Sequence, residues 1–324
     1  MTPPEVILDR WVKARFRNEP EFSSYVGKLD IERVGSPSFR AFLSSFQNEM
    51  NEALRLENAN ASGGVEHPPF HFDYLDAAVE IKNDHAFQHE GFSFIVATLP
   101  LVESIVDVSQ RLSRSAVAVQ LLSLDSGALE PDILQGFLAQ IQLLFLISHE
   151  YAHHVHQHSA RRDQSRVWTE FPHRATCGNI DFQAQELDAD GYATYLVLTH
   201  LLRGERRQSA LIQLERANMP AADCDELLLS CFFLAVLAFF CTFWHGNIVA
   251  SVYQLTHPPP PVRIKYAIQV AQMWCRQFDS VPQSWFSPPR LQDLFRAATE
   301  AVGKTARQSW DTEISLLASA DGAR

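Results

Sequence analysis

The sequence predicts an α+β fold that is mainly α-helical. Apolar residues recur at helical spacing in most segments, whereas the stretch from Gly91 to Leu99 is rich in β-branched and aromatic residues. Proline-rich and polar stretches separate these segments. The 324 residues allow a sizeable core. We expect an N-terminal helical region over residues 1–70, a main domain over 71–300 and a C-terminal tail over 301–324.

The first third of the chain is predicted to be helical, with one loop and one strand. We assign residues 1–57 to helices, because a segment such as Arg40–Leu56 has apolar residues at helical spacing. The asparagine, glycine and proline content of Asn58–Pro69 indicates a loop. Apolar periodicity predicts a helix over Phe70–Asn83, and after the strand a further helix over Pro100–Ser113.

The remaining two thirds are predicted to consist of long helices. Pro131 and Asp132 open a helix that runs from Ile133 to about His158, because proline and an acidic residue favour a first turn. A polar surface insertion over residues 159–180 then precedes a second long helix. The predicted helices after this insertion are Phe182–Leu202, Leu227–Trp244 and, following a run of four prolines, Val262 to about Phe278.

Composition and charge exclude some classes of protein. The formal net charge is −11 and the isoelectric point is about 5.6, which argues against nucleic acid as a partner because phosphate binding needs a basic face. The N-terminal residues have no apolar segment of the kind that secretory signals carry. Five cysteines lack C-x-x-C spacing, which favours reduced thiols in a cytoplasmic protein; they are Cys177, Cys224, Cys231, Cys241 and Cys275.

The segment Leu227–Trp244 leaves two interpretations open. It contains no charged residue and reaches the lower length limit of a membrane span. We expect a fully buried central helix, because no cluster of lysine or arginine residues anchors either end. A membrane is therefore not an expected partner, although a membrane span stays the alternative.

The most informative motif is an H-E-x-x-H sequence that runs from His149 through Glu150 to His153 inside a predicted helix. Two histidines four residues apart lie on one face of a helix, so both imidazoles can reach one zinc ion. Glu150 can then hold and deprotonate a zinc-bound water. The plainer interpretation is a pair of solvent-facing histidines, because the segment is rich in this residue; an adventitious metal site could form from His154, His156 and His158.

A catalytic zinc site needs a third protein ligand and one open position for water. In one zincin class this ligand is a histidine ten residues after the first, preceded by a glycine. Here those positions hold Ser159 and His156, which excludes that class. In the other class the third ligand is a glutamate on a downstream helix.

An E-x-x-A-D sequence on the predicted helix over Phe182–Leu202 supplies such a glutamate. Glu186 and Asp190 lie one turn apart on one face, so Glu186 can bind zinc while Asp190 accepts a hydrogen bond from a zinc histidine, most simply His149. Asp188 is the rival ligand, but it lies about 200° around the helix from Glu186. The small residue Gly191 permits close approach of a second helix, and an exposed acidic face is the alternative.

These motifs together resemble the gluzincin metallopeptidases, in particular the group of CAAX-processing and HtpX-type proteases. Residues 256–264 also match that group's T-H-P-P-x-x-x-R-I segment at each fixed position. The resemblance implies that His257 is a partner of the substrate carbonyl or the transition state, and that Arg263 stabilises the site. A helix start with a buried arginine is the plainer role of this segment, and the two roles can coexist.

The resemblance also implies a zincin-like metallopeptidase domain over residues 71–300, with a small sheet whose edge strand lines the cleft. Residues 83–101 are similar to the family's edge-strand segment, although Asp84 interrupts its N-A pair and Pro100 stands near the usual glycine turn. An extended peptide could pair with this edge. The expected edge strand is Phe92–Thr98, with Phe94, Val96 and Thr98 as its substrate-facing residues.

Among members of this kind a soluble relative is the better analogy. The sequence has no N-terminal membrane helices of the HtpX type, and in size and character it is similar to the Lit-type peptidase, a cytosolic zinc protease with an H-E-x-x-H motif. We therefore expect a cytoplasmic zinc endopeptidase that holds one catalytic ion and acts on a protein or peptide substrate. Tyr192 and Tyr195 are further, weaker candidates beside His257 for stabilising the oxyanion.

Two alternatives remain open at this point. A catalytically inactive zinc-binding module could bind peptides without cleaving them, although only catalysis needs an acid-base residue such as Glu150. A membrane-integrated protease could use residues 227–244 as its span. A structural zinc site would fill the fourth position with a further protein ligand, for which His156 and Cys177 are the candidates.

Overall fold

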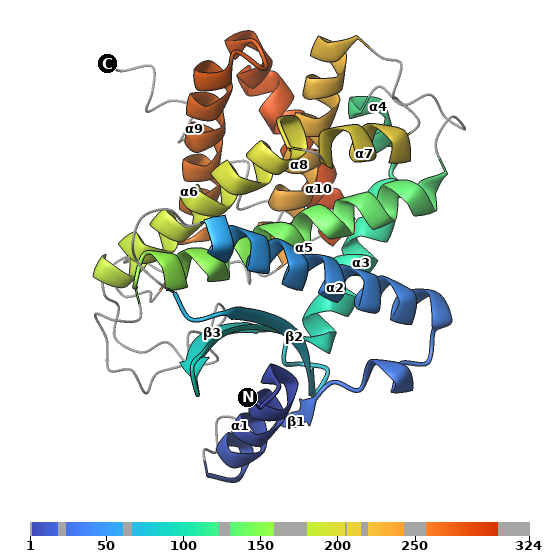
Figure 1. Ribbon diagram of the computed structural model, residues 1–324. Helices are drawn as coiled ribbons and strands as arrows, with labels where there is room; N and C mark the ends of the chain where they lie inside the picture. The colour runs from blue at the N-terminus through green and yellow to red at the C-terminus, as the bar shows by residue number, and fades with distance from the viewer. Residues whose placement is uncertain are drawn as a thin grey trace. The chain divides into compact units, whose positions relative to one another are not determined.

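The computed structural model describes residues 2–18, 24–60, 67–122, 130–158, 180–204, 206–214, 220–242 and 257–303. Helices and a small mixed sheet make up these residues, which confirms the α+β, mainly helical class (Figure 1). The chain divides into two compact units. Unit 1 comprises Met1–Ser104 and Glu150–His173, and unit 2 comprises Ile105–His149 and Arg174–Arg324. The predicted division at residues 70 and 300 stays a prediction.

Unit 1 contains a four-stranded sheet in the order β1-β2-β4-β3. β1 pairs antiparallel with β2, β2 pairs parallel with β4, and β4 pairs antiparallel with β3. The elements of this unit are α1 (Pro4–Asn18), β1 (Tyr25–Lys28), η2 (Ile31–Arg33), α2 (Pro37–Asn60), β2 (Phe70–Ala77), β3 (Asp84–His89), β4 (Phe92–Thr98) and the start of α3 (Leu99–Ser113).

A tight turn joins β3 to β4. Glu90 and Gly91 form this turn, and both have positive φ values, 43° and 81°. Two consecutive positive φ values are the signature of a type I′ turn, whose twist matches that of the flanking strands. The turn sets the antiparallel register in which His89 lies opposite Phe92.

α1 and α2 cover parts of the sheet. Trp11 of α1 stacks on Phe87 of β3 with ring centroids 3.8 Å apart, within a buried cluster that also includes Phe94 and Val96 of β4. α2 lies along β2 (Figure 1), where the Asn51 side chain donates to the carbonyl of Phe72 at 3.0 Å and accepts from its amide at 2.7 Å. This amide side chain therefore replaces a neighbouring strand at that part of the β2 edge.

Unit 2 is helical throughout the residues that the structure describes there. Two helices are divided between the units: α3 begins in unit 1 and α5 ends in it. The helices that follow α5 in the chain belong to unit 2, as does α4. These elements are α4 (Ala116–Leu121), α5 (Pro131–Val155), α6 (Ile180–Leu202), α7 (Arg206–Gln213), α8 (Ala221–Thr242), α9 (Pro260–Phe278), η4 (Gln283–Phe286) and α10 (Pro288–Val302).

α8 is the apolar centre of unit 2. It packs on α6, α9 and α10, and its side chains from Leu227 to Cys241 are buried. Among the described residues, α5 and α8 are the two helices long and apolar enough to cross a membrane, with 67% and 89% of the relevant windows buried inside the structure. A core helix gives the same result, so this property alone says little about a membrane.

The structure confirms the long helices that the sequence predicts, but two predictions in the N-terminal part are wrong. Phe70–Ala77 is a strand rather than part of a helix, and Tyr25–Lys28 is a strand inside the region assigned to helices. Burial explains the first error, since the side chains from Phe70 to Leu75 are all buried and leave no alternating pattern. The insertion over 159–179 and the tail over 304–324 lie outside the described residues.

The prediction that Phe92–Thr98 is an edge strand is also wrong. The segment is a strand, β4, but it pairs on one side with β2 and on the other with β3. The side chains of Phe94 and Val96 belong to the buried cluster under α1. Thr98 donates its hydroxyl to the Ile81 carbonyl at 2.7 Å. All three predicted substrate-facing residues are therefore structural.

Four of the five cysteines lie in the described part of unit 2 and are free thiols. Burial raises the pKa of each, and that of Cys275 reaches about 12. They are therefore protonated, unreactive core residues. Cys177 lies outside the described residues.

The contact between α6 and α9 gives a test of this packing. A Cβ atom on Gly191 of α6 would lie 2.8 Å from a ring carbon of Tyr266 on α9. We expect Gly191→Ala to lower the free energy of unfolding by about 1–3 kcal/mol through overpacking. In a Tyr266→Ala background the same change should raise it by about 1 kcal/mol, because alanine is then simply the better helix former. Urea denaturation measures both.

Gly136→Ala is the matched control, because a Cβ atom there meets nothing within 4 Å. It should be stabilising by up to about 1 kcal/mol in either background. If Gly191→Ala changed the free energy of unfolding equally with and without the Tyr266 ring, the close approach of α9 to Gly191 would be contradicted.

Candidate active site

The H-E-x-x-H motif occupies the last turns of α5. The helix begins at Pro131, whose missing N–H costs nothing in a first turn, and Asp132 follows there. His149, Glu150 and His153 are 2%, 1% and 1% exposed, and their potential ligand atoms lie within 4.8 Å of one another. The three residues belong to one continuous helix, so the helix itself fixes their relative positions. The alternative of solvent-facing histidines does not fit this burial.

Two carboxylates of α6 contact His149. Its Nδ1 lies 3.0 Å from Asp190 Oδ1, and its Nε2 lies 3.3 Å from Glu186 Oε2. Both carboxylates are buried, Glu186 at 1% exposure and Asp190 at 0%. A carboxylate accepts hydrogen bonds, so Nδ1–H of His149 donates to Asp190, while Nε2 faces Glu186. Asp188, the rival ligand, is exposed.

Arg263 binds the same aspartate from α9. Its Nε lies 2.7 Å from Asp190 Oδ2 and its Nη2 lies 2.7 Å from Oδ1, a bidentate pair with both side chains buried. The guanidinium carbon also lies 4.8 Å from the ring centroid of Phe240. Such a pair holds a carboxylate in a fixed orientation. Asp190 therefore links Arg263 to His149.

His257 lies just before α9 and close to the second carboxylate. Its Nε2 is 3.7 Å from Glu186 Oε1, and its side chain is 20% exposed. The T-H-P-P-x-x-x-R-I segment thus places its histidine near Glu186 and its arginine on Asp190. Tyr195, by contrast, packs against Phe278 at the far end of α9.

The last turn of α5 also makes contacts within unit 1. His154 Nε2 donates to the Phe94 carbonyl at 3.1 Å, and burial lowers the pKa of His154 to about 4. His153 Nδ1 lies 2.9 Å from His158 Nδ1. Neither role follows from the histidine-rich composition of this segment. No sequence signal identifies His158, because its position depends on the end of α5 at Val155 and on the left-handed Gln157.

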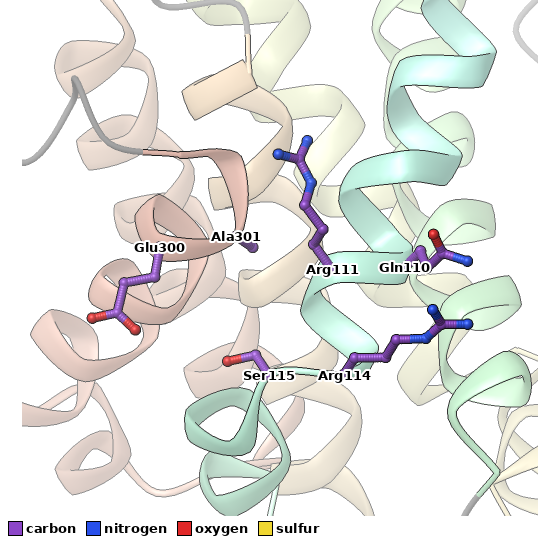
Figure 2. A pocket seen from close by; sticks show the side chains of 6 residues that line it. All are labelled: Gln110, Arg111, Arg114, Ser115, Glu300 and Ala301. Atoms are coloured by element: carbon purple, nitrogen blue, oxygen red, sulfur yellow. The ribbon is translucent and has the colours of Figure 1, made fainter.

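Unit 2 also contains a cavity of about 320 Å³ (Figure 2). Arg111 is bound to Asp107 at 2.8 Å, and Arg114 and Gln110 point away from Glu300 (Figure 2). No predicted site residue lines this cavity; its lining residues are Gln110, Arg111, Arg114, Ser115, Glu300 and Ala301.

Comparison with known families gives one match. The family described as Peptidase U49 matches residues 136–277, which is less than half of the chain. This range contains His149, Glu186, His257 and Arg263, and it excludes β4. No curated protein and no solved structure matches the chain. The similarity supports a peptidase whose substrate is a protein or a peptide.

The buried pair between Arg263 and Asp190 generates a prediction about stability. Arg263→Met leaves the Asp190 carboxylate buried without its guanidinium partner, so we expect it to lower the free energy of unfolding by about 3–5 kcal/mol. Adding Asp190→Asn removes the uncompensated charge and should recover part of this loss. Urea denaturation of the two single variants and the double variant measures the coupling.

Arg114→Met is a suitable control, because that arginine is 3.7 Å from Asp132 in a pair whose side chains are 58% and 83% exposed. Its loss should cost less than about 1 kcal/mol. Strictly additive effects of the Arg263 and Asp190 substitutions would contradict the prediction.

Proposed function

We propose that this protein is a zinc-dependent endopeptidase of the gluzincin type. The observation that carries the proposal is the buried contact between His149 of the H-E-x-x-H motif and Glu186 of α6, with Asp190 behind the histidine. The similarity to Peptidase U49 supports the same class of enzyme over the same residues. We assign His149, His153 and Glu186 as the zinc ligands.

The donor set fits zinc. An imidazole nitrogen and a carboxylate oxygen are both zinc donors, and His149 Nε2 and Glu186 Oε2 are 3.3 Å apart, close enough that both could bind one ion. His149 also presents the required nitrogen, because Asp190 accepts the proton on Nδ1. His153 follows one turn later on the same helix face. Two imidazoles and one carboxylate leave one coordination position open for catalysis.

Each site residue then has a chemical role. A bound zinc supplies Lewis-acid chemistry, in which it polarises the peptide carbonyl and makes water acidic near neutral pH. Glu150 takes the proton from the attacking water and delivers it to the leaving amine. His257 donates a hydrogen bond to the oxygen of the carbonyl as negative charge develops there. Asp190 and Arg263 keep His149 in its orientation and tautomer.

Glu150→Gln tests the acid-base role. The amide cannot take the proton, so hydrolysis should fall by at least about 10²–10⁴-fold, while zinc content stays at one ion per chain. The measurement combines elemental analysis of the purified protein with mass spectrometry of new peptide N-termini in a proteome-derived peptide library. Glu130→Gln, at an exposed position before α5, is the matched control and should cleave normally.

Cleavage at the wild-type rate by Glu150→Gln would overturn the acid-base assignment. Zinc-loaded wild-type protein that cleaves nothing in the library would favour the non-cleaving binding module. X-ray absorption that finds four protein ligands would favour a structural zinc site.

His257→Gln tests the oxyanion role. We expect kcat to fall about 10²–10³-fold with little change in zinc content, because the proposal places His257 outside the ligand set. Steady-state kinetics on a peptide found in the library give kcat and KM separately. Loss of zinc together with activity would instead make His257 a ligand.

A further inference from the structure

His153 and His158 form a buried pair at the end of α5. Their Nδ1 atoms are 2.9 Å apart, and the two residues are 1% and 6% exposed. Their ring planes are inclined at 68°, with centroids 5.1 Å apart, so the contact is edge-on rather than stacked. A nitrogen-to-nitrogen distance of this size is a hydrogen bond, in which one ring donates and the other accepts.

The way in which α5 ends produces this pair. Gln157 has a φ of 54°, in the left-handed region, and reverses the chain after the last helical turn. The amide of Gln157 then donates to the His154 carbonyl at 3.1 Å, and the amide of His158 donates to the His153 carbonyl at 3.1 Å. This is the Schellman pattern of a helix stop. It brings His158 back over His153 by backbone hydrogen bonds alone.

Zinc chemistry determines the direction of the hydrogen bond. A histidine that binds zinc through Nε2 carries its proton on Nδ1. Nδ1–H of His153 must then donate, and the Nδ1 of His158 must accept, so His158 is the neutral Nε2–H tautomer. His149 has the same arrangement with a carboxylate, since its Nδ1 lies 3.0 Å from Asp190.

We propose that His158 is a positioning residue that orients His153 and fixes its tautomer for zinc, as Asp190 does for His149. This inference rests on the proposed function, because it requires that His153 is a zinc ligand. His158 acts through His153 and touches neither the ion nor the substrate. The two proposed imidazole ligands thus donate to different kinds of acceptor. His149 donates to the charged carboxylate of Asp190, and His153 donates to the neutral imidazole of His158.

The test compares zinc affinity in three variants by competition with a chromophoric chelator. His158→Leu fills the position with an apolar side chain and removes the acceptor, and it should weaken zinc binding about 10–100-fold. His158→Gln keeps an acceptor oxygen and should stay within a few-fold of the wild type. His89→Gln removes a histidine of β3 that is 36% exposed and takes no part in this hydrogen bond, and its zinc affinity should be unchanged.

The outcomes separate this inference from the proposed function. Wild-type protein that binds no zinc refutes the zinc endopeptidase itself. Wild-type protein that binds zinc while His158→Leu binds it equally well refutes the role of His158 alone. Equal losses in His89→Gln and His158→Leu also refute it, because they indicate a general effect of removing a histidine.

A second measurement applies even if His158→Leu does not fold. Nitrogen-15 NMR of the zinc-loaded wild-type protein, labelled at histidine, reports which ring nitrogen of each residue carries the proton. We expect the Nε2–H tautomer for His158 and a protonated Nδ1 for His153. A proton on Nδ1 of His158 would overturn the proposal, because that nitrogen could no longer accept.

Discussion

The buried carboxylate of Asp190 is the constraint on which the rest of the candidate site depends. It accepts from His149 on one side and from the guanidinium of Arg263 on the other, at distances between 2.7 and 3.0 Å. A carboxylate at 0% exposure is costly unless its charge is paired and its lone pairs are used. α5, α6 and α9 each supply one member of this chain of contacts. The orientation of the His149 imidazole therefore depends on how these three helices pack.

Much of this site could be predicted from local spacing. Residues four apart on a helix share a face, which groups His149 with His153 and Glu186 with Asp190, and the same geometry turns Asp188 toward solvent. Contacts between segments distant in sequence are harder to predict from local spacing. The small Gly191 suggested close helix packing, but only the fold identifies Tyr266 of α9 as the side chain that fills the space.

The sheet was harder to predict, for two physical reasons. Phe70–Ala77 is buried along most of its length, so its apolar residues do not alternate, and a short apolar run fits either a helix or a strand. The residue types of β4 predict a strand, but its place in the interior depends on parallel pairing with β2, which no local pattern encodes. The contact of His158 with His153 could not be predicted from the sequence either. It depends on the left-handed conformation of Gln157, at a position where glycine or asparagine is usual.

The order of strands in unit 1 has a consequence for how the chain assembles. β4 lies between β2 and β3, although β3 precedes it in sequence, so the strands cannot be added one at a time from the N-terminus. The two-residue turn at Glu90 and Gly91 allows β3 and β4 to form a hairpin first, on a microsecond timescale, and the hairpin then docks its β4 side on β2. The Phe94 carbonyl that receives His154 belongs to β4, the strand between β2 and β3. The last turn of α5 is therefore anchored to an interior strand, which is present only when the hairpin has joined the sheet.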